Sequence, residues 1–151
     1  MNQKIKQLSV VLNIEQKKTS DALIEYTKAN KSVQDNELQL NSLRQYQQEY
    51  RQKVNGVFQG CLSAQTLQIY TRFISQLDKA ILEQRGRLEE CKKKAEEKFK
   101  LYLQAKQKFE GLQKVIEKEQ IKEAIKQQKY EQKQYDESAS NQWYSNRKEQ
   151  E

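Results

Sequence analysis

Apolar residues recur along the chain at alternating steps of three and four positions. From Ile5 to Val57 this spacing passes through 16 positions, of which 12 are apolar, and from Leu67 to Ile116 it passes through 15, of which 13 are apolar. A repeat of this length is typical of a coiled-coil seam rather than of the wider apolar face of a globular helix. The pattern therefore predicts two long helices, over about residues 4–56 and about residues 64–135.

The phase of the repeat breaks over about residues 56–63, where two of the four glycines of the chain precede Ser63. Gly56 or Gly60 can take the left-handed conformation that often ends a helix. Ser63 is a residue type that commonly caps the start of the next helix. The break is therefore predicted to be a turn.

If the chain reverses at this turn, residues that face each other should have numbers with a constant sum. Seam pairs from Tyr50 with Tyr70 to Ile5 with Ile116 give 120 or 121. We therefore predict an all-α fold, in which residues 1–135 form a single domain, a long antiparallel two-helix coiled-coil hairpin. The polar residues 136–151 are expected to form a frayed C-terminal tail.

The composition agrees with a thin helical seam and excludes several kinds of chemistry. The chain has 151 residues, of which 35% are hydrophobic and 32% charged, and it contains no proline. It also contains no histidine, which excludes His-dependent catalytic triads and His-containing zinc sites. Cys61 and Cys91 are too far apart in the predicted hairpin for an intramolecular disulfide. No Gly-rich phosphate loop is present, so nucleotide hydrolysis by that route is excluded, and we expect no cofactor or metal.

The net charge of +7 raises the alternative of a nucleic-acid-binding helical arm. However, Lys92, Lys93 and Lys94 alternate with acidic residues at helical spacing, as on a solvated helix face, so we expect no nucleic-acid partner. The chain has no run of about 18 apolar residues and no cleavable signal near Met1, and two cysteines fit a reducing compartment. These features predict a cytoplasmic protein without direct membrane insertion.

Two large aromatic residues near the predicted turn, Tyr46 and Phe73, do not fit the seam. They belong to two stripes of helical spacing that lie on either side of the turn. The stripes consist of Gln39, Leu43, Tyr46 and Tyr50 on the first helix, and of Phe73, Leu77, Ala80 and Gln84 on the second. Either the stripes form an exposed aromatic patch, or Tyr46 and Phe73 only flank the seam.

The residues around the turn resemble the signature of the FliJ family, coiled-coil proteins of the flagellar type III export apparatus. The matching segments are Gln45-Tyr46-Gln47-Gln48-Glu49-Tyr50-Arg51 and Tyr70-x-x-Phe73-Ile74-x-x-Leu77-Asp78-Lys79-Ala80-Ile81, so the specific part covers about residues 39–84. The resemblance implies a fold similar to the coiled-coil part of the ATP synthase gamma subunit. The equivalent stalk of a virulence-type type III secretion system is the nearest alternative.

The resemblance also implies that the protein is not an enzyme, and it implies partners and a location. A FliJ-like protein is expected to bind the hexameric export ATPase, to promote assembly of its ring, to couple the ring to the membrane export gate FlhA, and to engage export chaperones. It would lie peripherally at the cytoplasmic face of the inner membrane. The gate-binding face would consist of the two stripes from Gln39 to Gln84. Basic residues near the paired ends of the hairpin are candidates for contact with the ATPase ring: Lys4, Lys6, Lys114, Lys118 and Lys122.

Overall fold

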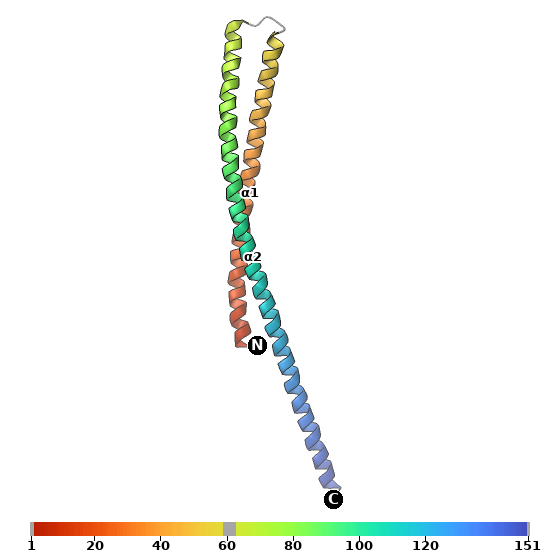
Figure 1. Cartoon of the computed structure of the whole chain (residues 1–151). Helices are drawn as coiled ribbons and strands as arrows, with labels where there is room; N and C mark the ends of the chain where they lie inside the picture. The colour runs from red at the N-terminus through yellow and green to blue at the C-terminus, as the bar shows by residue number, and fades with distance from the viewer. Residues whose placement is uncertain (1, 59–62, 151) are drawn as a thin grey trace. The chain divides into compact units, whose positions relative to one another are not determined.

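The structure, a computed structural model, describes residues 2–58 and 63–150. It contains two helices, α1 (Gln3–Phe58) and α2 (Ala64–Glu149) (Figure 1). Their residues divide into two compact units. We call Ser20–Gln104 the hairpin unit, and Met1–Thr19 together with Ala105–Glu151 the terminal unit. The predicted all-α fold, with two long helices packed against each other as in a coiled-coil hairpin, is confirmed, whereas the single domain over residues 1–135 stays a prediction.

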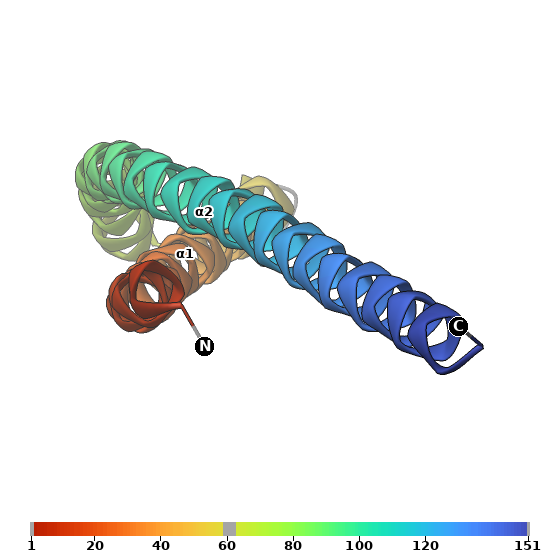
Figure 2. The same cartoon turned by 90° about the horizontal axis from the view of Figure 1, so that it is seen from below.

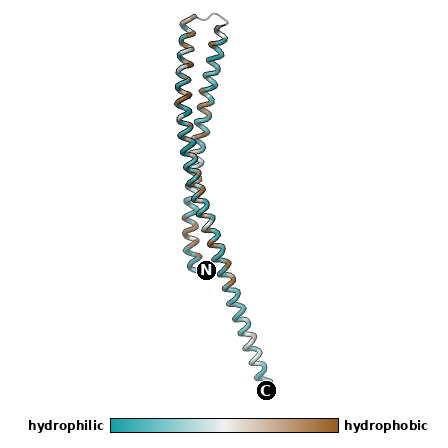
Figure 3. Tube along the Cα trace, in the orientation of Figure 1, coloured by the Kyte–Doolittle hydropathy of each residue, from teal (hydrophilic) through white to brown (hydrophobic). Residues whose placement is uncertain are grey.

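The core of the hairpin unit lies along the predicted seam. Its buried apolar residues come from both helices, and Leu43 and Cys91 pack against them while remaining partly exposed. Figure 3 shows the corresponding alternation of hydrophobic and hydrophilic segments along the two helices. Because the seam is narrow, each helix contributes only a few side chains to the main apolar cluster: Ala29, Val33 and Leu40 from α1, and Ile81, Leu88 and Ala95 from α2.

The helix ends near the turn agree with the prediction in part. α1 includes Gly56, and no glycine among the described residues has a positive φ, so Gly56 does not form a left-handed cap. Gly60 and Cys61 lie outside the described residues. Ser63 does cap α2, because its Oγ accepts a hydrogen bond from the Thr66 backbone N–H at 3.3 Å and its carbonyl oxygen accepts one from Leu67 N–H at 3.2 Å.

The terminal unit pairs the start of α1 with a later part of α2. Ile5 and Ile116 are both buried, at 4% and 6% exposed, as the seam predicts. Lys4 contacts Glu119, and Asn2 contacts Glu123. Because the two segments run antiparallel, the residues before Ile5 contact residues that follow Ile116.

Residues 136–149, which were expected to form a frayed tail, continue α2 as helix. Every residue from Ala124 to Gln150 is nevertheless exposed, and Figures 1 and 2 show the last turns of α2 without a neighbouring helix. The segment after Gly111 contains neither glycine nor proline, so nothing in the sequence interrupts the helix. Contacts one turn apart add local support, as between Arg147 and the Trp143 ring at 5.0 Å.

Neither α1 nor α2, over the described ranges, contains a stretch apolar enough to cross a membrane.

Candidate partner-binding surfaces

The hairpin unit presents aromatic side chains from both helices. Tyr46 and Phe73 are 55% and 37% exposed, and Tyr50 lies half-buried on the seam. The Tyr50 ring contacts Phe73 with centroids 4.6 Å apart and Tyr70 with centroids 5.9 Å apart. We call these four residues the aromatic surface. Lys53 adds a cation over the Tyr50 ring at 5.1 Å.

The packing of Tyr50 explains why this surface is exposed. Tyr50 and Tyr70 occupy facing seam positions, and two phenol rings are too large to close as compactly as the aliphatic seam. Phe73, one turn along α2, therefore packs edge-on against Tyr50 and keeps part of its ring accessible. The sequence left open whether Tyr46 and Phe73 form an exposed patch or only flank the seam. Phe73 flanks the seam at Tyr50 and also remains partly exposed.

Polar contacts border the aromatic surface. Gln47, which is buried, donates a hydrogen bond from Nε2 to Asp78 Oδ1, and Arg51 lies 3.6 Å from the same oxygen. These contacts link α1 to α2 and place a cation and an anion beside each other. Asp78 thus neutralises Arg51 locally, while Lys53 leaves a positive charge beside the rings.

Two of the eight residues predicted to form a gate-binding face are not accessible. Leu77 is 8% exposed and Gln84 is 3% exposed, because both lie in the helix–helix contact. Leu43 and Ala80 are partly buried, and Gln39 is exposed. The surface available to a partner is thus centred on Tyr46 and Phe73.

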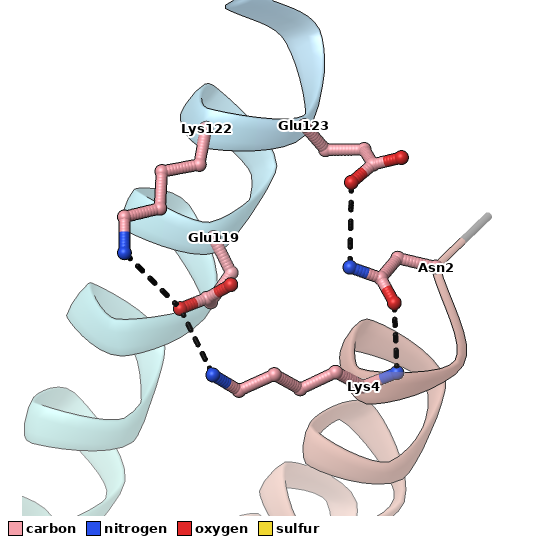
Figure 4. A network of polar contacts seen from close by, with 5 residues as sticks. All are labelled: Asn2, Lys4, Glu119, Lys122 and Glu123. Atoms are coloured by element: carbon pink, nitrogen blue, oxygen red, sulfur yellow. Dashed lines mark hydrogen bonds and ion pairs between the residues drawn. The ribbon is translucent and has the colours of Figure 1, made fainter. Parts of the chain in front are cut away.

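The terminal unit contains a polar network at the start of α1 (Figure 4). Lys4 Nζ lies 3.2 Å and Lys122 Nζ 4.0 Å from Glu119 Oε1. Asn2 donates a hydrogen bond from Nδ2 to Glu123 Oε2 at 3.3 Å, and its Oδ1 accepts one from the Lys4 backbone N–H at 3.2 Å. The Asn2 side chain therefore both caps α1 and joins it to α2.

The network divides the five lysines predicted to contact the ATPase ring into two groups. Lys4 and Lys122 share Glu119. Lys6, Lys114 and Lys118 are exposed, and within the described part of the chain they form no ion pair. An open cleft of about 400 Å³ adjoins the network, lined by Ile5 and Ala124 among polar residues of α2. All five lysines are exposed, and Lys6, Lys114 and Lys118 can meet an acidic partner without giving up an ion pair within the described residues.

One exposed aromatic contact lies outside the region that the sequence indicated. Phe99, 39% exposed, packs on Tyr26 with ring centroids 5.1 Å apart in the hairpin unit. The heptad pattern indicated off-seam aromatic residues near the turn and did not indicate this pair. The signal was Lys98 at a seam position, because a lysine there leaves the neighbouring Phe99 to cover the seam from the side. No group of three Cys, Asp or Glu residues within the described ranges is arranged to hold a metal ion.

The fold defines a two-helix coiled-coil protein with aromatic and charged side chains exposed on its surface. The family model described as "Flagellar FliJ protein" matches residues 3–148, and the chain belongs to this family. The Flagellar FliJ protein of Escherichia coli (strain K12) is 26% identical over 132 residues, which cover 87% of this chain and 90% of that protein. No solved structure matches the chain at a significant level. The chain is thus a component of flagellar protein export and biogenesis. The resemblance inferred from residues 39–84 is confirmed, and it extends over nearly the whole chain.

Proposed function

We propose that this protein is a stalk of the flagellar export apparatus that binds two partners and carries out no chemical step itself. The terminal unit binds the export ATPase ring and promotes its assembly, and the aromatic surface binds the export gate FlhA. The family match over residues 3–148 carries the proposal. The exposed rings of Tyr46 and Phe73, which the fold leaves accessible, support the gate contact.

The aromatic surface has the chemistry of a protein contact. Aromatic residues are enriched at interfaces, where they bury a large area at a small cost in conformational entropy. Tyr46 is 55% exposed, and its hydroxyl makes no hydrogen bond within the described part of the chain. Its side chain is therefore available to a partner without loss of internal contacts.

The terminal unit has the dimensions and charge for a ring contact. Two helices side by side are about 20 Å wide, which is among the widest simple elements that fit the central hole of a hexamer. Lys6, Lys114 and Lys118 are exposed there and would meet acidic loops of the ring. A single helix pair inside a six-fold ring makes unequal contacts with the six ATPase subunits. These contacts bias which subunits hold nucleotide only if their strength differs between the conformational states of a subunit.

The same proposal covers location and further partners. Bound to the ring and to FlhA, the protein would lie in the cytoplasm, peripherally at the cytoplasmic face of the inner membrane. Export chaperones would be additional partners. Both comparisons name flagellar proteins, which favours the flagellar apparatus over a virulence-type secretion system. A nucleic-acid-binding arm is disfavoured because Glu89, Glu90, Glu96 and Glu97 interrupt the basic residues of α2.

The test combines two readouts on the full chain. The ATPase rate and ring assembly of the cognate export ATPase are measured with and without the protein, and FlhA binding is measured for the wild type and for Tyr46→Ala/Phe73→Ala. The matched control is Leu38→Ala/Leu82→Ala, which removes two exposed apolar side chains, 65% and 69% exposed, from the same unit. Helicity of each variant is checked by circular dichroism.

Stimulated ring assembly, with FlhA binding lost in the aromatic variant and kept in the control, would support the proposal. Equal loss in both variants would contradict a specific role of the aromatic surface. No effect on the ATPase together with no FlhA binding would overturn the stalk assignment.

A further inference from the structure

A buried polar layer crosses the apolar core of the hairpin unit. Gln84, 3% exposed, donates hydrogen bonds from Nε2 to Asn36 Oδ1 at 2.8 Å and to the Asn36 carbonyl oxygen at 3.2 Å. Asn36 in turn donates from Nδ2 to the Ser32 carbonyl oxygen at 2.7 Å and lies 3.5 Å from Cys91 Sγ. These residues join α1 to α2 between apolar layers that contain Val33, Leu40, Ile81 and Leu88.

The layer satisfies its own polar groups. Among the described residues, no buried side-chain nitrogen or oxygen lacks a hydrogen-bond partner. A buried amide without a partner would lose the hydrogen bonds it makes to water in the unfolded chain. The layer therefore favours the arrangement in which Asn36 and Gln84 meet, and disfavours any arrangement that separates them.

The apolar seam alone does not specify such an arrangement. Because seam positions repeat every seven residues, sliding α1 along α2 by one heptad again brings apolar positions together. In the two nearest slid registers Gln84 would face Ala29 or Leu43, both apolar positions of the seam. In either case the Gln84 amide would be buried against an apolar side chain.

We propose that the Asn36–Gln84 layer is the register lock of the hairpin: it selects one alignment of α1 against α2 among alignments that the apolar seam accepts almost equally. The layer thereby determines which side chains of the two helices face each other elsewhere in the hairpin unit, including the pairing of Tyr50 with Phe73. Polar residues at single seam positions are a known means of fixing register in coiled coils, at some loss of stability.

The test measures register directly in the full chain. Spin labels are carried by unnatural amino acids at the exposed positions Asn41 and Arg87, so that the native cysteines remain. A slide by one heptad displaces one helix along the other by about 10 Å, which changes the distance between the labels. The distance distribution is compared for the wild type, for Asn36→Leu/Gln84→Leu, and for the swap Asn36→Gln/Gln84→Asn, which keeps two amides in the layer.

We expect one narrow distance in the wild type and in the swap variant, and at least one additional displaced distance in the leucine variant despite equal or higher thermal stability. The matched control, Gln34→Leu/Gln76→Leu, makes the same chemical change at exposed positions and should keep one distance. If the leucine variant loses helicity, Asn36→Val/Gln84→Met, closer in volume, takes its place. A single unchanged distance in a folded apolar variant would overturn the proposal, as would slippage of equal extent in the control.

Discussion

The rings of Tyr50 and Phe73 pack edge-on between α1 and α2, with centroids 4.6 Å apart and an interplanar angle of 61°. Tyr50 lies on the seam and Phe73 beside it, so this contact links the interhelical core to the exposed aromatic surface. Tyr46, the other exposed aromatic residue of the surface, makes no ring contact among the described residues. Of the two exposed residues of the aromatic surface, Phe73 thus contributes to the packing of the helices, whereas Tyr46 makes no ring contact within the described ranges that would stabilise the fold.

This difference predicts unequal effects of two alanine substitutions on the free energy of unfolding. Phe73→Ala removes the contact with Tyr50 and should lower the free energy of unfolding by about 1 kcal/mol, whereas Tyr46→Ala should change it by less than about 0.5 kcal/mol. Urea unfolding followed by circular dichroism at 222 nm, the usual helix signal, measures both. Phe73→Leu, which keeps apolar contact, should lie between the two. An equal loss in Tyr46→Ala would show that Tyr46 is structural.

The glycines inside α2 should be replaceable with a gain in stability. A Cβ added at Gly86 or Gly111 would meet nothing within 4 Å, so neither glycine marks a close approach of another segment. Gly86→Ala and Gly111→Ala should each raise the free energy of unfolding by about 1 kcal/mol, because alanine loses less backbone entropy in a helix. Gln113→Ala, an exposed change that leaves the backbone entropy almost unaltered, is the control for the same denaturation measurement. A decrease for either glycine variant would mean that the helix needs a glycine there, for instance to bend.

The fold followed from the sequence because one physical rule, the heptad spacing of apolar residues, applies along nearly the whole chain. The aromatic surface was predictable in position, since Tyr46 and Phe73 break that spacing near the turn. Accessibility was less predictable: Leu77 and Gln84 belong both to the stripe and to the heptad spacing of the seam, and their burial in the structure follows the seam.

Two further features could not be read from spacing. Asn36 and Gln84 each appear in the sequence as a polar interruption of an apolar seam, and their mutual hydrogen bonds depend on the register of both helices. Residues 136–149 lack the heptad and were expected to fray, yet they continue α2 because local helix propensity is not opposed by glycine or proline.

The cap at the start of α2 should contribute measurably to stability. Ser63 Oγ accepts a hydrogen bond from the Thr66 backbone N–H at 3.3 Å and lies 2.9 Å from Thr66 Oγ1. Ser63→Ala removes the side-chain acceptor and should cost about 1 kcal/mol of unfolding free energy, whereas Ser63→Asp keeps an acceptor and should cost little. Thermal unfolding of the three chains compares them. Equal stability of the alanine and serine chains would show that water replaces the cap at no cost.

Binding to the export ATPase ring should depend on salt through Lys6, Lys114 and Lys118, exposed lysines of the terminal unit that form no ion pair within the described residues. Replacing Lys6, Lys114 and Lys118 with glutamine should weaken ring binding at low ionic strength and flatten its decline as salt is raised, because exposed charge pairs are screened. The matched control replaces Lys92, Lys93 and Lys100, which are exposed lysines of the hairpin unit. Affinity measured over a series of salt concentrations separates the two sets. An unchanged salt dependence in the first variant, or an equal change in the control, would speak against a contact through these lysines.

The last turns of α2 should be dispensable for the stability of the hairpin. Residues 136–149 are helical but exposed, and within the described residues their ring and cation contacts are local, such as that between Trp143 and Tyr144. A chain ending at Tyr135 should therefore unfold at the same urea concentration as the full chain, within about 0.5 kcal/mol, because isolated helical turns add little to a cooperative core. Hydrogen exchange gives the complementary test in the full chain: amides of residues 136–149 should exchange rapidly, and those near Ile116, which is 6% exposed, slowly. Slow exchange beyond Tyr135 would show that this segment packs on another surface, and the same experiment with the ATPase ring present would then tell whether that surface belongs to the ring or to a second copy of the chain.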